Sequence, residues 1–405
     1  MKSLTHKEGF LHRFVGFSRS YPEHIAIRDL DAEETVTYRD LRIRAEECNG
    51  FLHALNVSPG EKVALVLPNG VDFIAYYLAV IGHGAVPVIL NYKLTAFELG
   101  NVLGISKPSL IVTTGTLFEQ HQDIFQPTHA LIVGNGDEPP ENATVEATLS
   151  RQAQPLSLPD DNPIVSMQFT YRGIGKPLAV CHRYLDLTQS SDGLHEQFHP
   201  QGVGSVHLVT LLLGCAAVLQ GYGLTESMPV IVQSSVGEVH RGAMGRPISG
   251  VELRVVDAQG QDVVAGRIGE LLIRGSMVIP GYDAAPEINA RFFRDGWLHT
   301  GDLVWRDEEG HVFFYCQRLR ISKIKAQMVD LAEIESVALK HPDAVRARAY
   351  IVPDHKDVNV LHLSVEGDGE LSQNSVTTLL SRYLSGFKLP KIIEIVPLKE
   401  ALHAR

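Results

Sequence analysis

The feature that most constrains the fold is a series of short apolar runs separated by segments of helical length, between residues 36 and 113. Residues 63–67 are uninterruptedly apolar and end at a Pro-Asn-Gly turn, which is typical of a strand buried on both faces. Residues 72–81 then carry apolar side chains at helical spacing, and the runs at 85–90 and 110–113 predict two more strands. Strands that alternate with helices predict a parallel sheet with crossover helices.

The pattern changes in the second half of the chain. Residues 251–256 and 269–275 alternate apolar and polar side chains between turn residues, which predicts a half-exposed antiparallel sheet. Residues 134–163 are rich in Gly, Pro, Asn and Asp and predict a surface connection. After about residue 317 the expected elements are a strand at 321–325, a helix at 331–340, a strand at 347–352 and a helix at 375–384.

These patterns predict an α/β fold class with two domains. The large N-terminal domain, residues 1–317, is expected to combine parallel sheets and crossover helices with a small β-barrel-like part. Residues 318–405 are expected to form a small C-terminal α+β domain.

Composition excludes several classes of protein. The formal net charge of −11 argues against a protein that neutralises nucleic-acid phosphates. No apolar stretch approaches the roughly 18 residues of a membrane-spanning helix, and the first residues lack an apolar signal core. The four cysteines have no C-x-x-C spacing, which fits a reduced compartment. We therefore expect a cytoplasmic protein that binds no nucleic acid and has no membrane span.

Four motifs follow one another in a recognisable order. They are residues 60–69 (beginning Gly-Glu-Lys-Val), 220–227 (Gln-Gly-Tyr-Gly-Leu-Thr-Glu-Ser), 281–287 (Gly-Tyr, then Pro-Glu) and 296–302 (Gly-Trp-Leu-His-Thr-Gly-Asp). In this order they resemble the adenylate-forming superfamily of acyl-CoA and aryl-CoA ligases, peptide-synthetase adenylation domains and luciferases. The resemblance implies an acyl-adenylate formed from a carboxylate and ATP. A thiol then displaces AMP after a small, mobile C-terminal domain rotates.

The resemblance also implies roles for single residues. Tyr222 and Gly223 are candidates for binding a nucleotide or CoA: Tyr222 would pack on a purine, and Thr225 would contact phosphate. Glu226 would hold Mg²⁺, a hard cation that prefers carboxylate and phosphate oxygens. Asp302 would accept hydrogen bonds from ribose hydroxyls. The alternative is an ordinary strand-to-loop turn without a ligand.

The expected phosphate loop departs from the family pattern. That loop is normally rich in Gly, Ser and Thr, so that backbone N–H groups approach the phosphates closely. Here Thr170 and Lys176 remain as candidates for binding a nucleotide or CoA, but Tyr171 and Arg172 replace small residues, and Leu178 stands where a second lysine belongs. The sequence predicts a loop impaired for ATP.

Two further departures affect the same half-reaction. Gln317 replaces the ribose-binding arginine of the family's hinge, and the position of the catalytic C-terminal lysine falls near His403 or Ala404. A positive charge there stabilises the adenylation transition state, and neither residue supplies one permanently. The segment from Leu185 to Gln220 is also short, where the family has a full lobe that shapes the acyl pocket. Either the pocket is truncated, or a partner or a second subunit completes it.

The second half-reaction keeps its expected element. Residues 322–335 resemble the hairpin that lines the pantetheine channel, with Lys325, Ala326 and Gln327 as the candidate channel residues. Ala326 replaces a usual glycine, so its methyl group narrows the passage. The alternative is a hairpin retained only for folding.

Few other residues suggest chemistry. His182 matches a histidine that follows the phosphate loop in the family and is the candidate general base, with Glu226 as the second catalytic candidate. Cys181 and Cys215 are more simply explained as packing residues, since buried free cysteines behave as small hydrophobes. The histidines show no H-x-x-x-H spacing, and no metal ligands are predicted.

Three functions stay open on these grounds. The first is an acyltransferase that moves an acyl group from acyl-CoA to the phosphopantetheine thiol of an acyl carrier protein, as in secondary metabolite biosynthesis, with an aromatic acyl group as one candidate. It would use the coenzyme A thioester as substrate and need no ATP. The second is an ATP- and Mg²⁺-dependent, AMP-forming acyl- or aryl-CoA ligase. The third is a catalytically inactive protein that regulates a related ligase.

Overall fold

The structure is a computed structural model that describes residues 9–29, 32–134, 142–159, 161–189, 192, 221–232, 240, 242–317, 321–324, 327–353 and 359–398. The chain forms two compact units. The first unit comprises Met1–Asp161, Val165–Ala179 and Arg320–Arg405, and the second comprises Asn162–Ile164 and Val180–Leu319. The predicted limit of two domains at residues 317 and 318 stays a prediction.

The first unit contains most of a seven-stranded sheet with the order β7-β6-β5-β3-β4-β8-β9. Its strands are β3 (Lys62–Val66), β4 (Val86–Ile89), β5 (Leu110–Thr114), β6 (His129–Val133), β7 (Ala143–Val145), β8 (Ile164–Thr170) and β9 (Leu178–Arg183). The pairs from β7 to β8 along this order are parallel. Residues 63–66 are completely buried. This confirms the prediction of a parallel sheet and of a strand covered on both faces.

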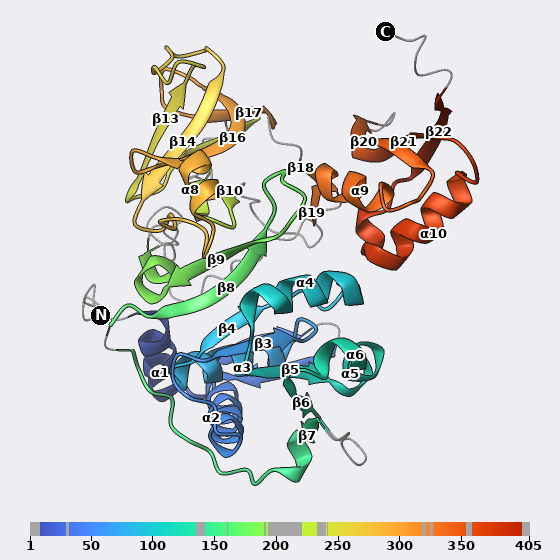
Figure 1. Ribbon diagram of the computed structural model, residues 1–405. Helices are drawn as coiled ribbons and strands as arrows, with labels where there is room; N and C mark the ends of the chain where they lie inside the picture. Colours follow the sequence, from blue (N-terminus) through green and yellow to red (C-terminus); the bar gives the residue numbers. More distant parts are fainter. Residues whose placement is uncertain are drawn as a thin grey trace. The chain divides into compact units, whose positions relative to one another are not determined.

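Helices connect the parallel strands (Figure 1, blue to green). These connections are α3 (Val71–Gly82), α4 (Ala96–Ser106), α5 (Gly115–Gln120), α6 (Gln122–Phe125) and the 3₁₀ turn η1 (Glu146–Thr148). Before β3 come α1 (Phe10–Ser20), a hairpin of β1 (Ile25–Asp29) and β2 (Glu34–Thr37), and α2 (Tyr38–Ala54). The predicted helix at 72–81 is therefore correct. Helix α4 begins at a capping box in which Thr95 and Glu98 bind each other's backbone N–H groups.

One segment differs from its prediction. Residues 143–145, expected to lie in a surface connection, form β7 at the edge of the parallel sheet, where Val145 is buried. The reason is that only three residues pair there, and such a short run is hidden by the surrounding Gly, Pro and Asn.

The second unit contains an eight-stranded sheet (Figure 1, yellow to orange). Its order is β10-β11-β12-β17-β16-β14-β13, and β15 pairs with β16. The elements are β10 (Gly221–Leu224), β11 (Met228–Val232), β12 (Ala243–Pro247), β13 (Val251–Val256), β14 (Gly269–Gly275), α8 (Pro286–Phe292), β15 (Phe293–Arg294), β16 (Trp297–Arg306) and β17 (Val312–Gln317). All of these pairs are antiparallel, as predicted for 251–256 and 269–275. This curled sheet is the β-barrel-like part, with edges at β10 and β13.

The C-terminal segment has the predicted α+β composition (Figure 1, orange to red). Its elements are β18 (Ile321–Ile324), β19 (Gln327–Asp330), α9 (Leu331–Ala338), β20 (Ala344–Pro353), β21 (Asn359–Gly367), α10 (Gln373–Tyr383), the 3₁₀ turn η2 (Gly386–Lys388) and β22 (Ile392–Pro397). Strands β20 and β21 are antiparallel, and β21 and β22 are parallel. Apolar side chains of the two helices and this sheet share one core.

The helices of the described residues are too short or too polar to cross a lipid bilayer.

Candidate functional site

The loop between β8 and β9 occupies the position of the expected phosphate loop. Gly173 and Gly175 adopt φ angles of 71° and 75°, a left-handed conformation that only glycine takes without strain. Between them and β8, Arg172 is buried, and Tyr171 is partly buried. The loop therefore keeps the backbone turns that glycine allows, while its side chains fill space that an open phosphate cradle leaves empty.

A carboxylate binds the backbone of this loop. The N–H group of Gly175 donates a hydrogen bond of 3.1 Å to Oδ2 of Asp330. The other oxygen of Asp330 accepts bonds from the N–H groups of Ala332 and Glu333, at 2.8 and 3.4 Å, and so caps α9. Burial raises the pKa of Asp330, although these three hydrogen bonds oppose the rise. An anionic side chain thus uses an N–H group of the kind that a phosphate would use.

A second carboxylate binds the first residue of the loop. The hydroxyl of Tyr171 donates to Oε1 of Glu333 at 3.2 Å, and the ammonium of Lys388 lies 4.8 Å from the centre of the Tyr171 ring. Burial, followed by the charges of Glu333 and Glu98, raises the pKa of Tyr171 well above its usual range. Tyr171 is therefore a neutral donor, held in place by an acceptor and a cation.

Lys388 balances the charge of this cluster only in part. Its ammonium donates to Oε2 of Glu333 at 2.8 Å and to Oε1 of Glu98 at 2.6 Å. The second oxygen of Glu98 accepts from the hydroxyl and the N–H group of Ser385. Burial raises the pKa of Glu333, against the attraction of Lys388. The Lys388 ammonium thus pairs with Glu98 and Glu333, and its charge acts on Asp330 from a greater distance. Because one ammonium serves three buried carboxyl groups, the surroundings of the loop oppose the approach of another anion.

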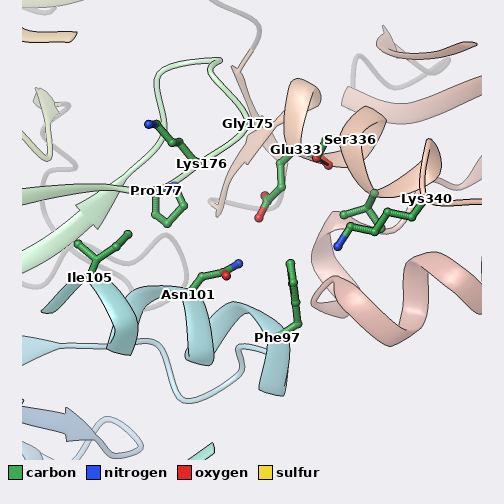
Figure 2. Close-up of a pocket in the computed structure, with 10 residues that line it drawn as sticks. Phe97, Asn101, Ile105, Gly175, Lys176, Pro177, Glu333, Ser336 and Lys340 are labelled. Carbon is green, nitrogen blue, oxygen red and sulfur yellow. Dashed lines mark hydrogen bonds between the residues drawn. The ribbon is translucent and has the colours of Figure 1, made fainter. Parts of the chain in front are cut away.

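A cavity of about 250 Å³ lies beside the loop. Figure 2 shows Phe97 and Asn101 of α4 facing Glu333 and Lys340 across it. The complete lining is Phe97, Asn101, Ile105, Gly175, Lys176, Pro177, Glu333, Ser336, Val337 and Lys340. Pockets for drug-sized ligands span roughly 300–1,000 Å³. This cavity is too small for a nucleoside triphosphate, whereas a slender chain needs less volume.

The second unit joins two residues of the recognised motifs. The hydroxyl of Tyr222, on β10, donates to Oδ2 of Asp302, on β16, at 2.6 Å. Strand β10 carries an irregularity between Tyr222 and Gly223, and Gly223 is exposed there. In the neighbouring strand, Gln317 is the register partner of Asp302. A ribose hydroxyl would meet a carboxylate that already accepts a strong hydrogen bond.

Glu226 is held by a tyrosine. The hydroxyl of Tyr282 donates to Oε1 of Glu226 at 2.6 Å, and the N–H group of Ile279 donates to the Glu226 carbonyl at 2.9 Å. Glu226 and Tyr282 are both buried. The Tyr282 hydroxyl therefore orients the carboxylate, while the Ile279 N–H group holds the Glu226 backbone.

His182 is completely buried on β9, and its orientation determines its tautomer. Its Nε2 lies 2.7 Å from the carbonyl oxygen of Thr225, so Nε2 carries the proton and Nδ1 carries the lone pair. Among the described residues, Nδ1 has no hydrogen-bond partner. Burial lowers the pKa of His182, while the Thr225 carbonyl and the charge of Glu226 oppose this effect. A neutral imidazole with an available lone pair has the properties of a general base.

The predicted site residues therefore separate into groups. His182 and Thr225 are in contact, as are Tyr222 and Asp302. Lys176 is exposed and lines the cavity, and Thr170 is partly buried at the end of β8. Their predicted roles in binding stay predictions.

The proposed pantetheine channel is described only in part. Lys325 and Ala326 lie outside the described residues, and so do His403 and Ala404. Of Gln327, the structure describes the backbone at the start of β19. Cys181 is partly exposed, whereas Cys215 lies outside the described residues.

Sequence reasoning assigned no role to four residues that organise these clusters: Tyr282, Asp330, Glu333 and Lys388. Tyr282 belonged to a recognised motif, which could have indicated a function. Asp330 stands three residues before Glu333, a spacing typical of a helix N-terminus, but nothing in the sequence shows that its second oxygen binds Gly175. Lys388 and Glu98 are 290 residues apart, so only the fold brings them together.

Comparisons with known proteins agree with these motifs. A family profile described as AMP-binding enzyme matches residues 16–211 and 202–283. The long-chain-fatty-acid–CoA ligase of Escherichia coli O157:H7 is 33% identical over 179 residues, which are 44% of this chain and 32% of that protein. Luciferin 4-monooxygenase of Photinus pyralis is 40% identical over 140 residues, which are 34% of this chain and 25% of that protein. The alignments thus span about a third or less of these relatives.

Solved structures share the fold over almost the whole chain. The amide bond synthetase McbA of Marinactinospora thermotolerans superposes with a TM-score of 0.82 at 19% identity, covering 96% of this chain and 95% of that one. A double mutant of the o-succinylbenzoate CoA synthetase MenE of Bacillus subtilis gives a TM-score of 0.77 at 20% identity, covering 95% and 94%. These likenesses show the fold alone. The family profile covers more than half of the chain, and the chain therefore belongs to the AMP-binding enzyme family.

Proposed function

We propose that this protein transfers an acyl group from an acyl-CoA thioester to the phosphopantetheine thiol of a carrier protein, without ATP. The observation that carries the proposal is the hydrogen bond from the Gly175 N–H group to the carboxylate of Asp330. A loop of this family needs its N–H groups for phosphates. Here one of them binds an internal anion, and two further carboxylates, Glu98 and Glu333, lie close by.

The chemistry needs a base and close approach of the two thioester partners. His182 would take the proton from the incoming pantetheine thiol at Nδ1, and the resulting thiolate would attack the carbonyl carbon of the acyl-CoA. The bond between that carbon and the CoA sulfur then breaks, and the leaving CoA thiolate takes the proton back from His182. One thioester replaces another, so no nucleotide or oxidant is consumed.

The position of His182 supports this role. Its Nε2–H group is held by the Thr225 carbonyl, which keeps the lone pair on Nδ1. Because burial lowers its pKa, the imidazole is neutral at physiological pH and can accept a proton. Glu226 is the weaker candidate, since its Oε1 already accepts from Tyr282.

The test mixes the purified protein with an acyl-CoA, a phosphopantetheinylated carrier protein and no nucleotide. The expected result is a carrier protein heavier by the acyl group, with one free CoA thiol released per acyl group transferred. The same carrier without its phosphopantetheine arm is the control and should stay unmodified. If no member of a panel of aliphatic and aromatic acyl-CoAs loads the carrier, the proposal is wrong.

A second candidate is an ATP-dependent acyl- or aryl-CoA ligase. It is favoured by the names of related proteins, several of which are CoA ligases, and by the retained pair of Tyr222 and Asp302. Under this alternative Glu226 would hold Mg²⁺, which compensates phosphate charge when bound. Carboxylate-dependent exchange of labelled pyrophosphate into ATP would establish it. A protein that shows neither activity but binds a related ligase tightly would be the regulatory alternative.

A further inference from the structure

We propose that the second unit binds one divalent transition-metal ion of the zinc class at His240, Asp307, Glu309 and His311. Each of these side chains offers one ligand atom, and the four atoms all lie within 4.8 Å of one another. The cluster includes none of the residues of the candidate functional site. It is therefore a separate site, independent of the proposed acyl transfer.

The fold assembles the cluster from two segments. Asp307 and His311 flank the tight turn between β16 and β17, where the Asp307 N–H group donates to the His311 carbonyl at 3.1 Å. The N–H group of His311 donates back to Oδ1 of Asp307 at 2.7 Å. His240 comes from the chain just before β12, and β12 pairs with β17. The ladder of β12 and β17 thus brings His240 to the turn.

The distances are close to those of a coordination sphere. Nδ1 of His311 lies 3.0 Å from Oδ2 of Asp307 and 3.7 Å from Oε2 of Glu309, while Nε2 of His240 lies 3.8 Å from the same Glu309 oxygen. Tetrahedral zinc with bonds of about 2.0–2.2 Å places neighbouring ligand atoms about 3.3–3.6 Å apart. The side chain of Glu309 is 65% exposed and that of His240 36%, so both have room to rotate toward an ion.

The donor set distinguishes a transition metal from other ions. Two imidazole nitrogens with two carboxylates suit zinc, whereas Mg²⁺ and Ca²⁺ prefer oxygen ligands alone. The two imidazole rings stack with their centres 3.6 Å apart. A doubly charged ion also balances the two carboxylates.

Four protein ligands leave no open position for a substrate. The site is therefore structural, and its effect is to fasten the turn between β16 and β17 to the segment before β12.

The test uses the full chain without a polyhistidine tag, freed of metal by dialysis against a chelator. Titration with Zn²⁺ should show one equivalent bound, and Co²⁺ should give the visible absorption of a tetrahedral site. The midpoint temperature of unfolding should rise with Zn²⁺ and should not change with Mg²⁺.

Matched variants separate the cluster from the rest of the surface. His240→Gln and Glu309→Gln should each weaken Zn²⁺ binding by more than the roughly 10- to 100-fold loss typical of an outer-shell substitution. Glu308→Gln, on the same turn, and His24→Gln, exposed elsewhere, should bind Zn²⁺ like the original chain. Binding without saturation at one equivalent, or binding that survives His240→Gln, would overturn the proposal. So would a Co²⁺ spectrum without tetrahedral features, because the four ligands would then not surround the ion as proposed.

Discussion

The ammonium of Lys388 lies 2.6 Å from Oε1 of Glu98, a residue 290 positions earlier, and both side chains are buried. The ammonium also binds Glu333, so one cation connects α4, α9 and the turn η2. A buried charge that loses its partner is strongly destabilising, since no water replaces the lost contacts.

Lys388→Met should lower the free energy of unfolding by about 3–5 kcal/mol, because Glu98 and Glu333 are left buried without a cation. Denaturant titration measures this difference. Lys391→Met, an exposed lysine in the next turn of chain, is the matched control and should change stability by less than about 0.5 kcal/mol. Equal effects of the two substitutions would show that the Lys388 pairs contribute nothing net.

The stability of the protein should fall as the pH rises through the acidic range. Burial raises the pKa of Asp330 and Glu333 above their ordinary values of 3.8 and 4.5, so the folded chain holds protons that the unfolded chain has released. The stability that these two carboxyl groups contribute is therefore fully present at a pH below their ordinary pKa values. It is lost as the pH rises through their raised pKa values in the folded chain. Denaturation measured between pH 4 and 7 should show a shallower slope for Glu333→Gln, and an unchanged slope for the exposed Glu308→Gln.

Asp330→Asn should make the phosphate loop more receptive to nucleotide. Asparagine is a good N-cap residue and preserves the start of α9, while the negative charge beside Gly175 disappears. We expect ATP affinity to increase at least about tenfold, equivalent to 1.4 kcal/mol, in a fluorescent-nucleotide titration. An original chain that already binds ATP tightly, with no gain in the variant, would contradict the role given to Asp330.

His182→Gln should slow acyl transfer by about 10²–10⁴-fold, the usual contribution of a general base. The transfer rate of the original chain should rise with pH as the His182 imidazole loses its proton. Because burial lowers the pKa of His182, the rate should level off at a lower pH than the ordinary imidazole pKa of 6.5 would give. His121→Gln changes another buried histidine whose pKa is lowered by burial, outside the site. That control should keep the rate profile, and a profile unaltered by His182→Gln would exclude His182 as the base.

Tyr282→Phe should destabilise the second unit by about 1–3 kcal/mol, because Glu226 loses a buried hydrogen-bond donor. Tyr315→Phe, on an exposed tyrosine of β17, is the control. Thermal unfolding of the two variants side by side measures the difference.

Helices and strands could be predicted where the local spacing of apolar residues reflects the burial of the element. The run at 63–67 is covered on both faces and was recognisable from its uninterrupted apolar residues, whereas β7 has only three residues and no such run. Helix α9 was recognisable because apolar side chains recur at helical spacing after Asp330. These patterns span only a few consecutive residues, so they can be recognised directly in the sequence.

For contacts between distant residues, the sequence shows the motifs that take part but not the contact between them. The motifs containing Tyr222 and Asp302 were both identified, but their hydrogen bond follows from the strand order of the curled sheet. The proposed metal ligands combine His240 with a turn more distant in the sequence, and no short spacing of histidines and carboxylates indicates this arrangement. The sequence predicts that Tyr171 and Arg172 obstruct phosphate binding. It does not predict that Asp330 and Glu333 bind this loop, because no local sequence pattern indicates contacts between segments so far apart.

The two hydrogen-bonding oxygens of Asp330 have a consequence for redesign. One oxygen starts α9 and the other restrains the loop at Gly175, so a single position governs both the first turn of a helix and the freedom of a distant backbone. An engineer who removes the whole side chain to reopen the loop would unwind the helix start in the same step. A selection for nucleotide use would therefore retain asparagine or serine there, and sequences with alanine at this position should be rare among its survivors.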